Sequence, residues 1–494
     1  MEILPVLEVE YPVTPEVIRP DSIYELHVTP AYLSERTRRP STTTHAGSDK
    51  SVFNESFRLE NPPSTFPPGF SESNQDPSTD VSSSAANRGL SKLQKRSSMI
   101  QFLALCWSIW LVGWNDGSSG PLLPRLQEYY NVGFSVLSLI FVGSCFGYIC
   151  GGALNVWLND RLGLGKILVL GSICQTCGYA IIIPAPPFPV LFCAYVIVGF
   201  GISFQTAQAN GFVGSLHEHM STKLGMMHAA YGSLGAFTSP FVSTYFSGFS
   251  DRRWAYHFTL SLVLALANLA VVIYVFRFRR QEEILSEAGQ EPSAESGMQQ
   301  QGSKYRQIFA QKAVPLLTVF ALIYIGVEYT LGGWIVTFII RQRHGGHSSG
   351  YISSGFFGGL TLGRVGLIWL NKMVGEHRII IFYSLVAIGL EMTVWFVPSI
   401  IENAVAVSLI GLVLGPMFPL LVSHMTHILP RWLLTGCVGL VTGIGVAGSA
   451  ALPFITGVLA AKYGIGSMQP LMISMMGVML LVWMCVPKAA RHVE

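Results

Sequence analysis

Apolar stretches of about 20 residues recur along the chain from residue 99 to residue 487, with short polar segments between them. One stretch of this length is enough for a helix to cross a hydrocarbon core of about 30 Å. We therefore expect an all-α membrane protein of twelve spans. The predicted spans are 100–121, 135–158, 166–184, 189–213, 225–248, 255–276, 313–340, 350–370, 379–398, 403–428, 435–460 and 468–487.

The spans fall into two groups of six, which predicts two pseudo-symmetric halves. A stretch rich in Glu, Gln, Ser and Gly, without a strong apolar period, separates the groups and is typical of a linker. The tail before the first span is polar and is expected to be disordered. The predicted segments are a cytosolic tail 1–98, an N-terminal half 99–276, a cytosolic linker 277–312, a C-terminal half 313–487 and a short cytosolic C-terminus 488–494.

Composition supports a membrane protein and excludes several other classes. Half of the 494 residues are apolar and 12% are charged, whereas soluble domains carry about 25% charged residues. The net charge of +3 is scattered, so no nucleic-acid partner is expected. Cys174 and Cys177 form a CxxC with no His, Asp or Glu nearby, so we expect neither a metal nor a cofactor.

Basic residues predict the orientation of the chain. With a cytosolic N-terminus, the segments on the inner side hold seventeen Lys and Arg residues beside the spans, and those on the outer side hold six. The positive-inside rule therefore places both termini in the cytosol. We expect a multi-pass protein of the plasma membrane, with a vacuolar membrane as the alternative.

Asp116 is the first ionisable residue that the spans place in the membrane. Inserting such a group into the membrane costs about 2.5–3.5 kcal/mol, so we expect it to have a functional or structural role. It lies in a glycine-rich segment between Trp114 and Pro121, and broken polar segments of this kind line cavities in transporters. In the alternative interpretation the span ends near Gly113, and Asp116 is a solvated loop residue.

Glu328 lies near the middle of the seventh span, with about twelve uncharged positions on each side. An unpaired carboxyl group there can exchange a proton, and a structural hydrogen bond is the alternative. Glu391 in the ninth span is at least as well explained by a structural role. Arg364 in the eighth span either pairs with a carboxylate or extends to the inner surface.

The fourth span carries an unusually dense set of amides and hydroxyls, and Gln205 and Gln208 share a helix face. Such groups suit a polar solute such as a sugar, and hydrogen bonds between helices are the alternative. We expect proton exchange at Glu328. The predicted residues of a solute cavity are Asn115, Gln205, Gln208, Asn210, His228, Tyr231 and Trp334.

The order of these motifs over residues 99–487 resembles the fucose:proton symporter type of the major facilitator superfamily, and its fungal relatives most closely. Asn115-Asp116, followed by an apolar segment that ends at Pro124, is similar to the first helix of that family. The resemblance implies that Asp116 gains and loses a proton during transport. Gln205 stands where bacterial members carry a glutamate, and it cannot titrate, so Glu328 is expected to compensate.

The loop after the second span also resembles the superfamily, through Asp160, Arg161 and Gly163. The resemblance implies that this loop latches the two halves together on the cytosolic face. The corresponding loop of the second half has Asn371 where an aspartate is expected.

The expected function is secondary active transport of a small organic solute by alternating access, with a proton gradient as energy source. Import of a sugar-like solute is the first expectation, and efflux of an organic metabolite is the alternative. The expected partners are the solute and the lipid bilayer, and the protein is expected to be a monomer. A sensor that signals through the tail is a second class. An enzyme is not expected, because no catalytic triad order, metal spacing or phosphate loop is present.

Overall fold

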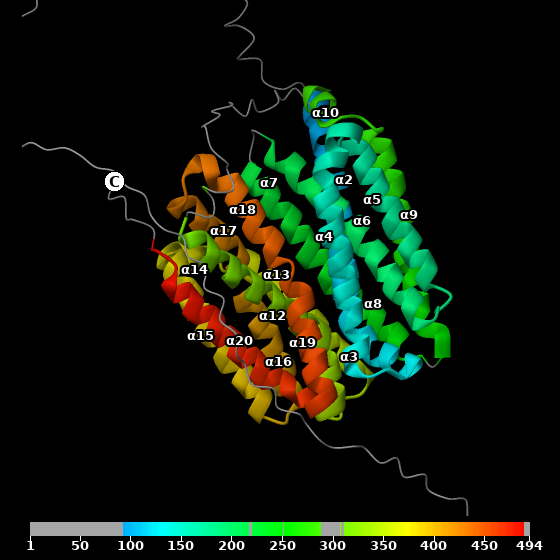
Figure 1. Cartoon of the computed structure of the whole chain (residues 1–494), viewed down its shortest axis with the longest axis vertical. Helices are drawn as coiled ribbons and strands as arrows, with labels where there is room; N and C mark the ends of the chain where they lie inside the picture. Colours follow the sequence, from blue (N-terminus) through cyan, green and yellow to red (C-terminus); the bar gives the residue numbers. More distant parts are fainter. Residues whose placement is uncertain (1–91, 217–219, 250, 288–306, 308–310, 489–494) are drawn as a thin grey trace, which may run out of the picture. The chain divides into compact units, whose positions relative to one another are not determined.

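The computed structural model describes residues 92–216, 220–249, 251–287, 307 and 311–488. Nearly all of the predicted tail, most of the linker and the C-terminus from residue 489 lie outside the described residues. Within the described ranges every regular element is a helix, and the two halves of the bundle lie side by side (Figure 1).

The described helices follow the predicted pattern. The N-terminal half contains α2 (Lys92–Tyr130), α3 (Phe134–Leu137), α4 (Leu139–Leu162), α5 (Leu164–Ile182), α6 (Phe188–Gly214), α7 (Met220–Ala229), the π-helical η1 (Ala230–Ala236), α8 (Phe237–Ser247), η2 (Asp251–Ala255), α9 (Tyr256–Phe276) and α10 (Gln281–Glu287). The C-terminal half contains α12 (Ala313–Gln342), η3 (His347–Gly350), α13 (Tyr351–Gly366), α14 (Ile368–Val374), α15 (Glu376–Phe396), α16 (Ile400–Leu414), α17 (Met417–Ile428), α18 (Arg431–Gly445), α19 (Gly448–Tyr463), η4 (Ile465–Ser467) and α20 (Met468–Cys485).

In the described residues the helices form twelve passages, as predicted. Ten of them are long and apolar enough to cross a membrane by length and composition in the described residues. The other two are divided into shorter helices. In the fifth, the π-helical turn η1 separates α7 from α8, and in the eighth a single residue, Leu367, separates α13 from α14. The fold is therefore the expected all-α membrane fold with two six-helix halves.

The first span differs from its prediction. It was expected over 100–121, but α2 continues from Lys92 to Tyr130 through Pro121 and Pro124. The alternative in which the span ends near Gly113 is wrong, because Asp116 lies within the helix. Dense packing explains the continuity, since α2 contacts η1, α8, α9 and α12.

Glycines allow the helices of each half to approach closely. A Cβ atom on Gly147 of α4 would collide with the backbone oxygen of Val196, and one on Gly199 of α6 would collide with that of Ser144. Small residues drive helix association in lipid through such contacts. Close packing of helices therefore explains these glycines without a contact to a ligand.

The two halves are in close contact where α2 meets α12 and where α8 meets η3. Gly120 of α2 approaches the backbone oxygen of Gly332, Gly350 approaches the side chain of Thr244, and no Cβ atom would fit at either glycine. Gly211 on α6, near the opposite end of the bundle, meets no atom within 4 Å. The halves are thus tightly packed at the end where the predicted outer loops lie.

The start of the linker forms an ordered helix, which the sequence pattern did not predict. Arg277 and Phe278 adopt positive φ angles of 47° and 59° and turn the chain back. Ile284 and Leu285 of α10 are then buried in a cluster of the N-terminal half that includes Phe276. A helix of seven residues is too short to show a convincing apolar period.

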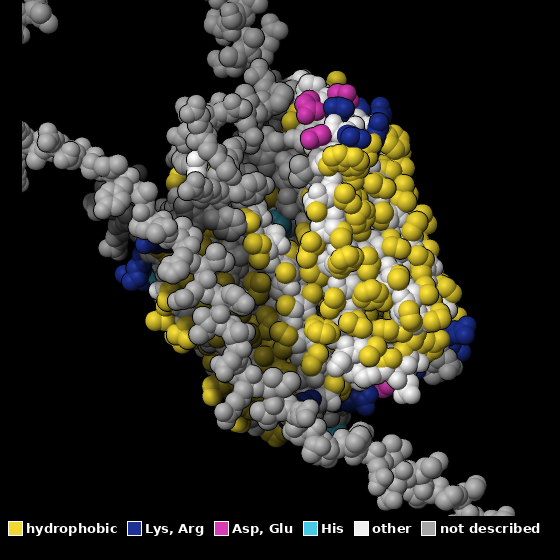
Figure 2. All heavy atoms as spheres, viewed as in Figure 1, with side chains coloured by type: hydrophobic (Ala, Val, Ile, Leu, Met, Phe, Trp, Pro, Cys, Tyr) yellow, Lys and Arg dark blue, Asp and Glu magenta, His cyan; other side chains and the backbone are white. Residues whose placement is uncertain are grey.

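The surface is typical of a protein surrounded by lipid. Hydrophobic side chains cover the wide middle of the N-terminal half, and charged groups gather at its ends (Figure 2). Ile149 on α4, Val263 on α9 and Leu266 on α9 are 48%, 55% and 48% exposed. Such exposure is unfavourable in water and favourable in a bilayer.

We predict that Gly199→Val lowers the thermal stability of the purified protein clearly, because overpacking costs about 1–3 kcal/mol. Gly211→Val on the same helix is the matched control, since its Cβ meets open space. The measurement is the melting temperature in detergent. Equal melting temperatures for the two variants would contradict the packing described for α4 and α6.

Candidate functional site

The carboxylate of Asp116 connects the two halves. Its Oδ2 atom accepts hydrogen bonds from the hydroxyl of Tyr231 in η1 at 2.7 Å and from that of Tyr329 in α12 at 2.8 Å. Its Oδ1 atom accepts one from Asn115 Nδ2 at 3.2 Å. Tyr231 belongs to the N-terminal half and Tyr329 to the C-terminal half. One carboxylate oxygen therefore holds a donor from each half, and each of these three donors is uncharged.

Close backbone approach brings Tyr231 to Asp116. A Cβ on Gly113 would collide with the backbone oxygen of Tyr231, and a Cβ on Gly235 would collide with that of Trp110. The π-helical turn η1 begins at Ala230, next to the tyrosine. Turns of this kind re-aim side chains and are frequent at functional sites.

An ion pair lies beside this bridge in the C-terminal half. The guanidinium of Arg364 on α13 is 3.6 Å from Glu328 Oε1 on α12, and Glu328 is 7% exposed. Arg364 Nε also donates to the backbone oxygen of Gly415 at 3.3 Å. The structure thus shows the pairing alternative for Arg364, with Glu328 as its carboxylate partner.

The ion pair also faces the N-terminal half. A Cβ atom built on Gly232 of η1 would lie 3.0 Å from Arg364 Nη1. Since Glu328 and Tyr329 are neighbours on α12, the ion pair and the Asp116 bridge are one residue apart along the helix. We name this group the central polar cluster. It consists of Asn115, Asp116, His228, Tyr231, Glu328, Tyr329 and Arg364.

Several members of the cluster are partly exposed, among them Asn115, Asp116, His228 and Tyr231. Hydroxyl, amide and guanidinium groups at such positions can exchange hydrogen bonds with a solute. The sequence interpretation missed Tyr329. Tyr329 directly follows Glu328 in a span otherwise rich in apolar residues, and this position could have identified it as a candidate site residue.

Gln205 is fully buried and bonded between helices. Its Nε2 donates to Gln175 Oε1 on α5 at 3.0 Å, and its Oε1 accepts from Asn268 Nδ2 on α9 at 3.3 Å. The structure therefore favours the alternative of hydrogen bonds between helices for this residue. Gln208, 5% exposed, donates to Asn155 Oδ1 on α4 at 2.8 Å.

Asn210 and Trp334 have different surroundings. Asn210 is partly exposed, and its Oδ1 atom has no hydrogen-bond partner. Trp334 is completely buried and donates to the backbone oxygen of Pro453 at 3.1 Å. Its ring lies against Phe134 and Phe141 of the opposite half. Trp334 thus contributes to the packing between halves, and these contacts do not include the central polar cluster.

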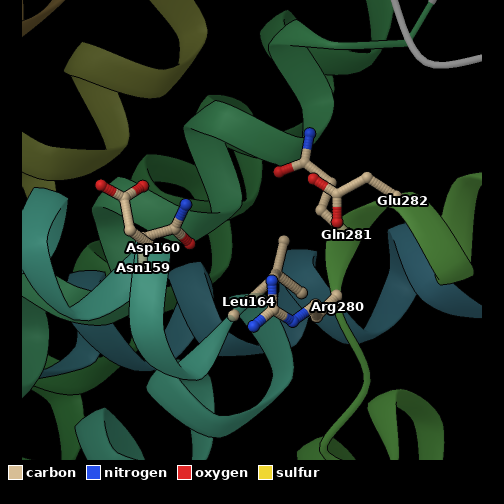
Figure 3. Close-up of a pocket in the computed structure, with 7 residues that line it drawn as sticks. Asn159, Asp160, Leu164, Arg280, Gln281 and Glu282 are labelled. Atoms are coloured by element: carbon tan, nitrogen blue, oxygen red, sulfur yellow. The ribbon is translucent and has the colours of Figure 1, made fainter.

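The loop after α4 lies against the beginning of the linker. Asp160 and Gly163 line a pocket of about 190 Å³ together with Arg280 and Glu282 (Figure 3). Gly163 has a φ of 78°, and a Cβ there would lie 2.8 Å from the Arg280 side chain, so both conformation and space favour glycine. The guanidinium of Arg161 stacks over the ring of Trp157 at 4.3 Å. These contacts lie within the N-terminal half, and the latch between halves stays a prediction.

No group of three or more His, Cys, Asp and Glu residues is arranged to hold a metal ion in the part of the chain that the structure describes. The side chains of the central polar cluster can form hydrogen bonds and ion pairs and can exchange protons.

Comparison with known proteins decides the family. The model of the Major Facilitator Superfamily matches residues 105–435. The chain belongs to this superfamily. It is a multi-pass membrane transporter of a small-molecule substrate and not an enzyme.

Two kinds of relatives are similar to this transporter. The Saccharomyces cerevisiae protein "Bypass of stop codon protein 6" is 26% identical over 434 residues, which are 82% of this chain and 84% of that protein. The crystal structure of a D-xylose-proton symporter matches with a TM-score of 0.64 at 11% identity, covering 79% of this chain and 98% of the other. The inward-open xylose transporter XylE from E. coli matches with a TM-score of 0.59 at 12% identity, covering 79% and 97%. The last two show the fold alone.

We predict that Arg364→Gln destabilises the transporter more than the double variant Arg364→Gln/Glu328→Gln. Breaking a buried pair leaves an uncompensated charge, which costs about 3–5 kcal/mol, whereas removing both charges costs less. Thermal unfolding of the single and double variants checks this. Additive effects of the two substitutions would show that the groups do not interact.

Proposed function

We propose that this transporter is a proton-coupled symporter of the fucose type that imports a sugar-like solute. The observation that carries the proposal is the carboxylate of Asp116, which binds Tyr231 and Tyr329 from opposite halves. A group that joins the two moving parts and can also hold a proton is suited to couple proton movement to alternating access.

Protonation changes what this carboxylate can bind. An ionised carboxylate only accepts hydrogen bonds, and its bonds to hydroxyl donors are charge-assisted. When Asp116 takes up a proton, the bonds from Tyr231 and Tyr329 lose that assistance, so the connection between α2 and α12 weakens. Protonation and separation of the halves are thereby linked.

Glu328 is the second proton-sensitive group of the proposal. As long as it is ionised, it holds Arg364, whose guanidinium lies against Gly232 of the other half. A proton on Glu328 would remove the partner of a buried guanidinium, which is costly. Proton uptake at Glu328 is therefore favourable only when Arg364 gains another acceptor, and a bound solute can supply one.

The chemistry of the cluster suits a polyhydroxylated solute. Asn115, His228 and Tyr231 are partly exposed and carry donors and acceptors. Such convergent polar groups recognise the hydroxyls of a sugar. Two transporters of the same fold are a D-xylose-proton symporter and a xylose transporter, which supports the same solute class here. Gln208 and Asn210 remain candidates for the solute path, whereas the packing of Trp334 gives it a supporting role.

Efflux of an organic compound is the second candidate. Gln205 stands where bacterial members of the fucose type carry a glutamate, and both ends of its amide are engaged within the N-terminal half. The coupling scheme of those importers therefore does not transfer unchanged. In both cases we propose that the termini are cytosolic and that the plasma membrane is the location, because the basic residues beside the spans favour that orientation.

The test is transport by the purified protein in proteoliposomes under an imposed pH gradient, acidic outside. The probes are labelled D-xylose, D-glucose, L-fucose and an aromatic organic acid. We expect accumulation of at least one sugar, abolished by a protonophore and reduced at least tenfold by Glu328→Gln. Gln307→Ala in the linker is the control variant.

Two outcomes would contradict the proposal. Accumulation that is the same with and without the gradient would exclude proton coupling. Outward movement of the organic acid from loaded vesicles, driven by protons and without sugar uptake, would establish the efflux candidate instead.

A further inference from the structure

A continuous chain of hydrogen bonds crosses the N-terminal half and ends on the carboxylate of Asp116. It connects four helices, α9, α6, α5 and α2. The chain runs in order through Asn268, Gln205, Gln175, Tyr179, Asn115 and Asp116.

The first part of the chain links the side-chain amides of three helices. Asn268 Nδ2 donates to Gln205 Oε1 at 3.3 Å, and Gln205 Nε2 donates to Gln175 Oε1 at 3.0 Å. Gln175 Nε2 then donates to the hydroxyl of Tyr179 at 3.2 Å. All four residues are at most 1% exposed, so water does not compete for these bonds.

The second part connects this buried chain to the proton site. The hydroxyl of Tyr179 donates to Asn115 Oδ1 at 3.2 Å, and Asn115 Nδ2 donates to Asp116 Oδ1 at 3.2 Å. Asn115 and Asp116 are partly exposed. The chain therefore runs from a dry interior to a carboxylate that a proton can reach.

Every donor in the chain points toward Asp116, and the contacts of two serines with Asn268 agree with this direction. Ser172 uses its hydroxyl proton on the backbone oxygen of Leu168 at 2.9 Å, so toward Asn268 it can only accept. Ser108 donates to the oxygen of the same amide at 2.8 Å. In this arrangement Asn268 presents its NH₂ group to Gln205, which then has only its own NH₂ group to offer Gln175.

An aligned chain of this kind has an electrostatic consequence. Hydrogen bonds that point the same way polarise one another, and at low dielectric the effect is stronger than in water. The chain presents its positive end to Asp116 and so stabilises the ionised carboxylate. A break at Gln175 or Tyr179 would weaken the bond from Asn115 without touching any group that contacts Asp116 directly.

We propose that Gln175, Tyr179 and Gln205 are positioning residues that set the pH at which Asp116 exchanges its proton. The inference rests on the proposed function, in which that exchange drives transport. It also gives Gln205 a reason to be an amide, because an ionised glutamate could accept from Asn268 but could not donate to Gln175.

Other titratable groups also face Asp116, and all of them except Tyr179 remain unchanged in the test. They come from each neighbouring element that carries such a group near the carboxylate. These are Tyr148 of α4, Tyr179 of α5, Tyr231 of η1 and both Glu328 and Tyr329 of α12. Arg364 of α13 lies beside Glu328, and His228 of α7 lies near Arg364.

The experiment measures proton binding at Asp116 directly. The infrared band of the protonated carboxyl is followed against pH in the purified protein, with Asp116→Asn identifying the band. Gln175→Met and Tyr179→Phe break the chain at different bonds. We expect both to move the midpoint toward alkaline pH by about 0.5 unit or more, since a weaker bond to the charged form favours the neutral one. Thr176→Val is the matched control on α5, because its hydroxyl bonds only its own helix at Ser172.

The pH profile of transport, measured on the same variants, separates this inference from the proposed function. A shift of the infrared midpoint together with the transport profile supports both. A shift of the infrared midpoint while transport does not depend on pH supports the chain and contradicts proton coupling. An unchanged infrared midpoint in Tyr179→Phe, which removes one oxygen atom only, overturns the inference whatever transport does.

Discussion

The hydrogen bonds from Tyr231 and Tyr329 to one oxygen of Asp116 are the interaction on which the rest of the site depends. They bring a donor from each half onto a single group whose charge can change. Their geometry requires that α2 and η1 touch at Gly113, because a side chain there would collide with the backbone of Tyr231. The packing of glycines and the electrostatics of the site are thus parts of one arrangement.

The membrane makes the charges of this site costly and therefore informative. Glu328 and Arg364 compensate each other at 3.6 Å, whereas Asp116 is held by neutral donors. A buried ion pair resists the loss of either charge, because the remaining partner would be left alone. A carboxylate supported by hydroxyls and an amide faces no such penalty when it takes up a proton. The site therefore combines a charge pair with a carboxylate whose hydrogen-bond donors are neutral.

The fold could be predicted from the sequence largely because lipid imposes a simple rule. Apolar stretches of sufficient length predict the spans. Acidic residues within these spans are rare, and this singles out Asp116 and Glu328 as candidate functional residues. The partners of these acids could not be predicted in the same way. Tyr329 is 213 positions from Asp116 along the chain, and periodicity does not determine which faces of two distant helices meet. Gln205 shows the same limit, since its amide could have faced a solute, and only its contacts with Gln175 and Asn268 place it between helices.

The central claim is that a proton on Asp116 couples transport to the gradient, and Asp116→Asn in proteoliposomes tests it most directly. The variant keeps the shape of the side chain and cannot ionise. Two modes of transport by the same sample are compared, exchange of labelled for unlabelled solute and accumulation driven by a pH gradient. The account predicts that exchange persists, because the halves still alternate, while gradient-driven accumulation is lost. Accumulation at the level of the unaltered protein would contradict it.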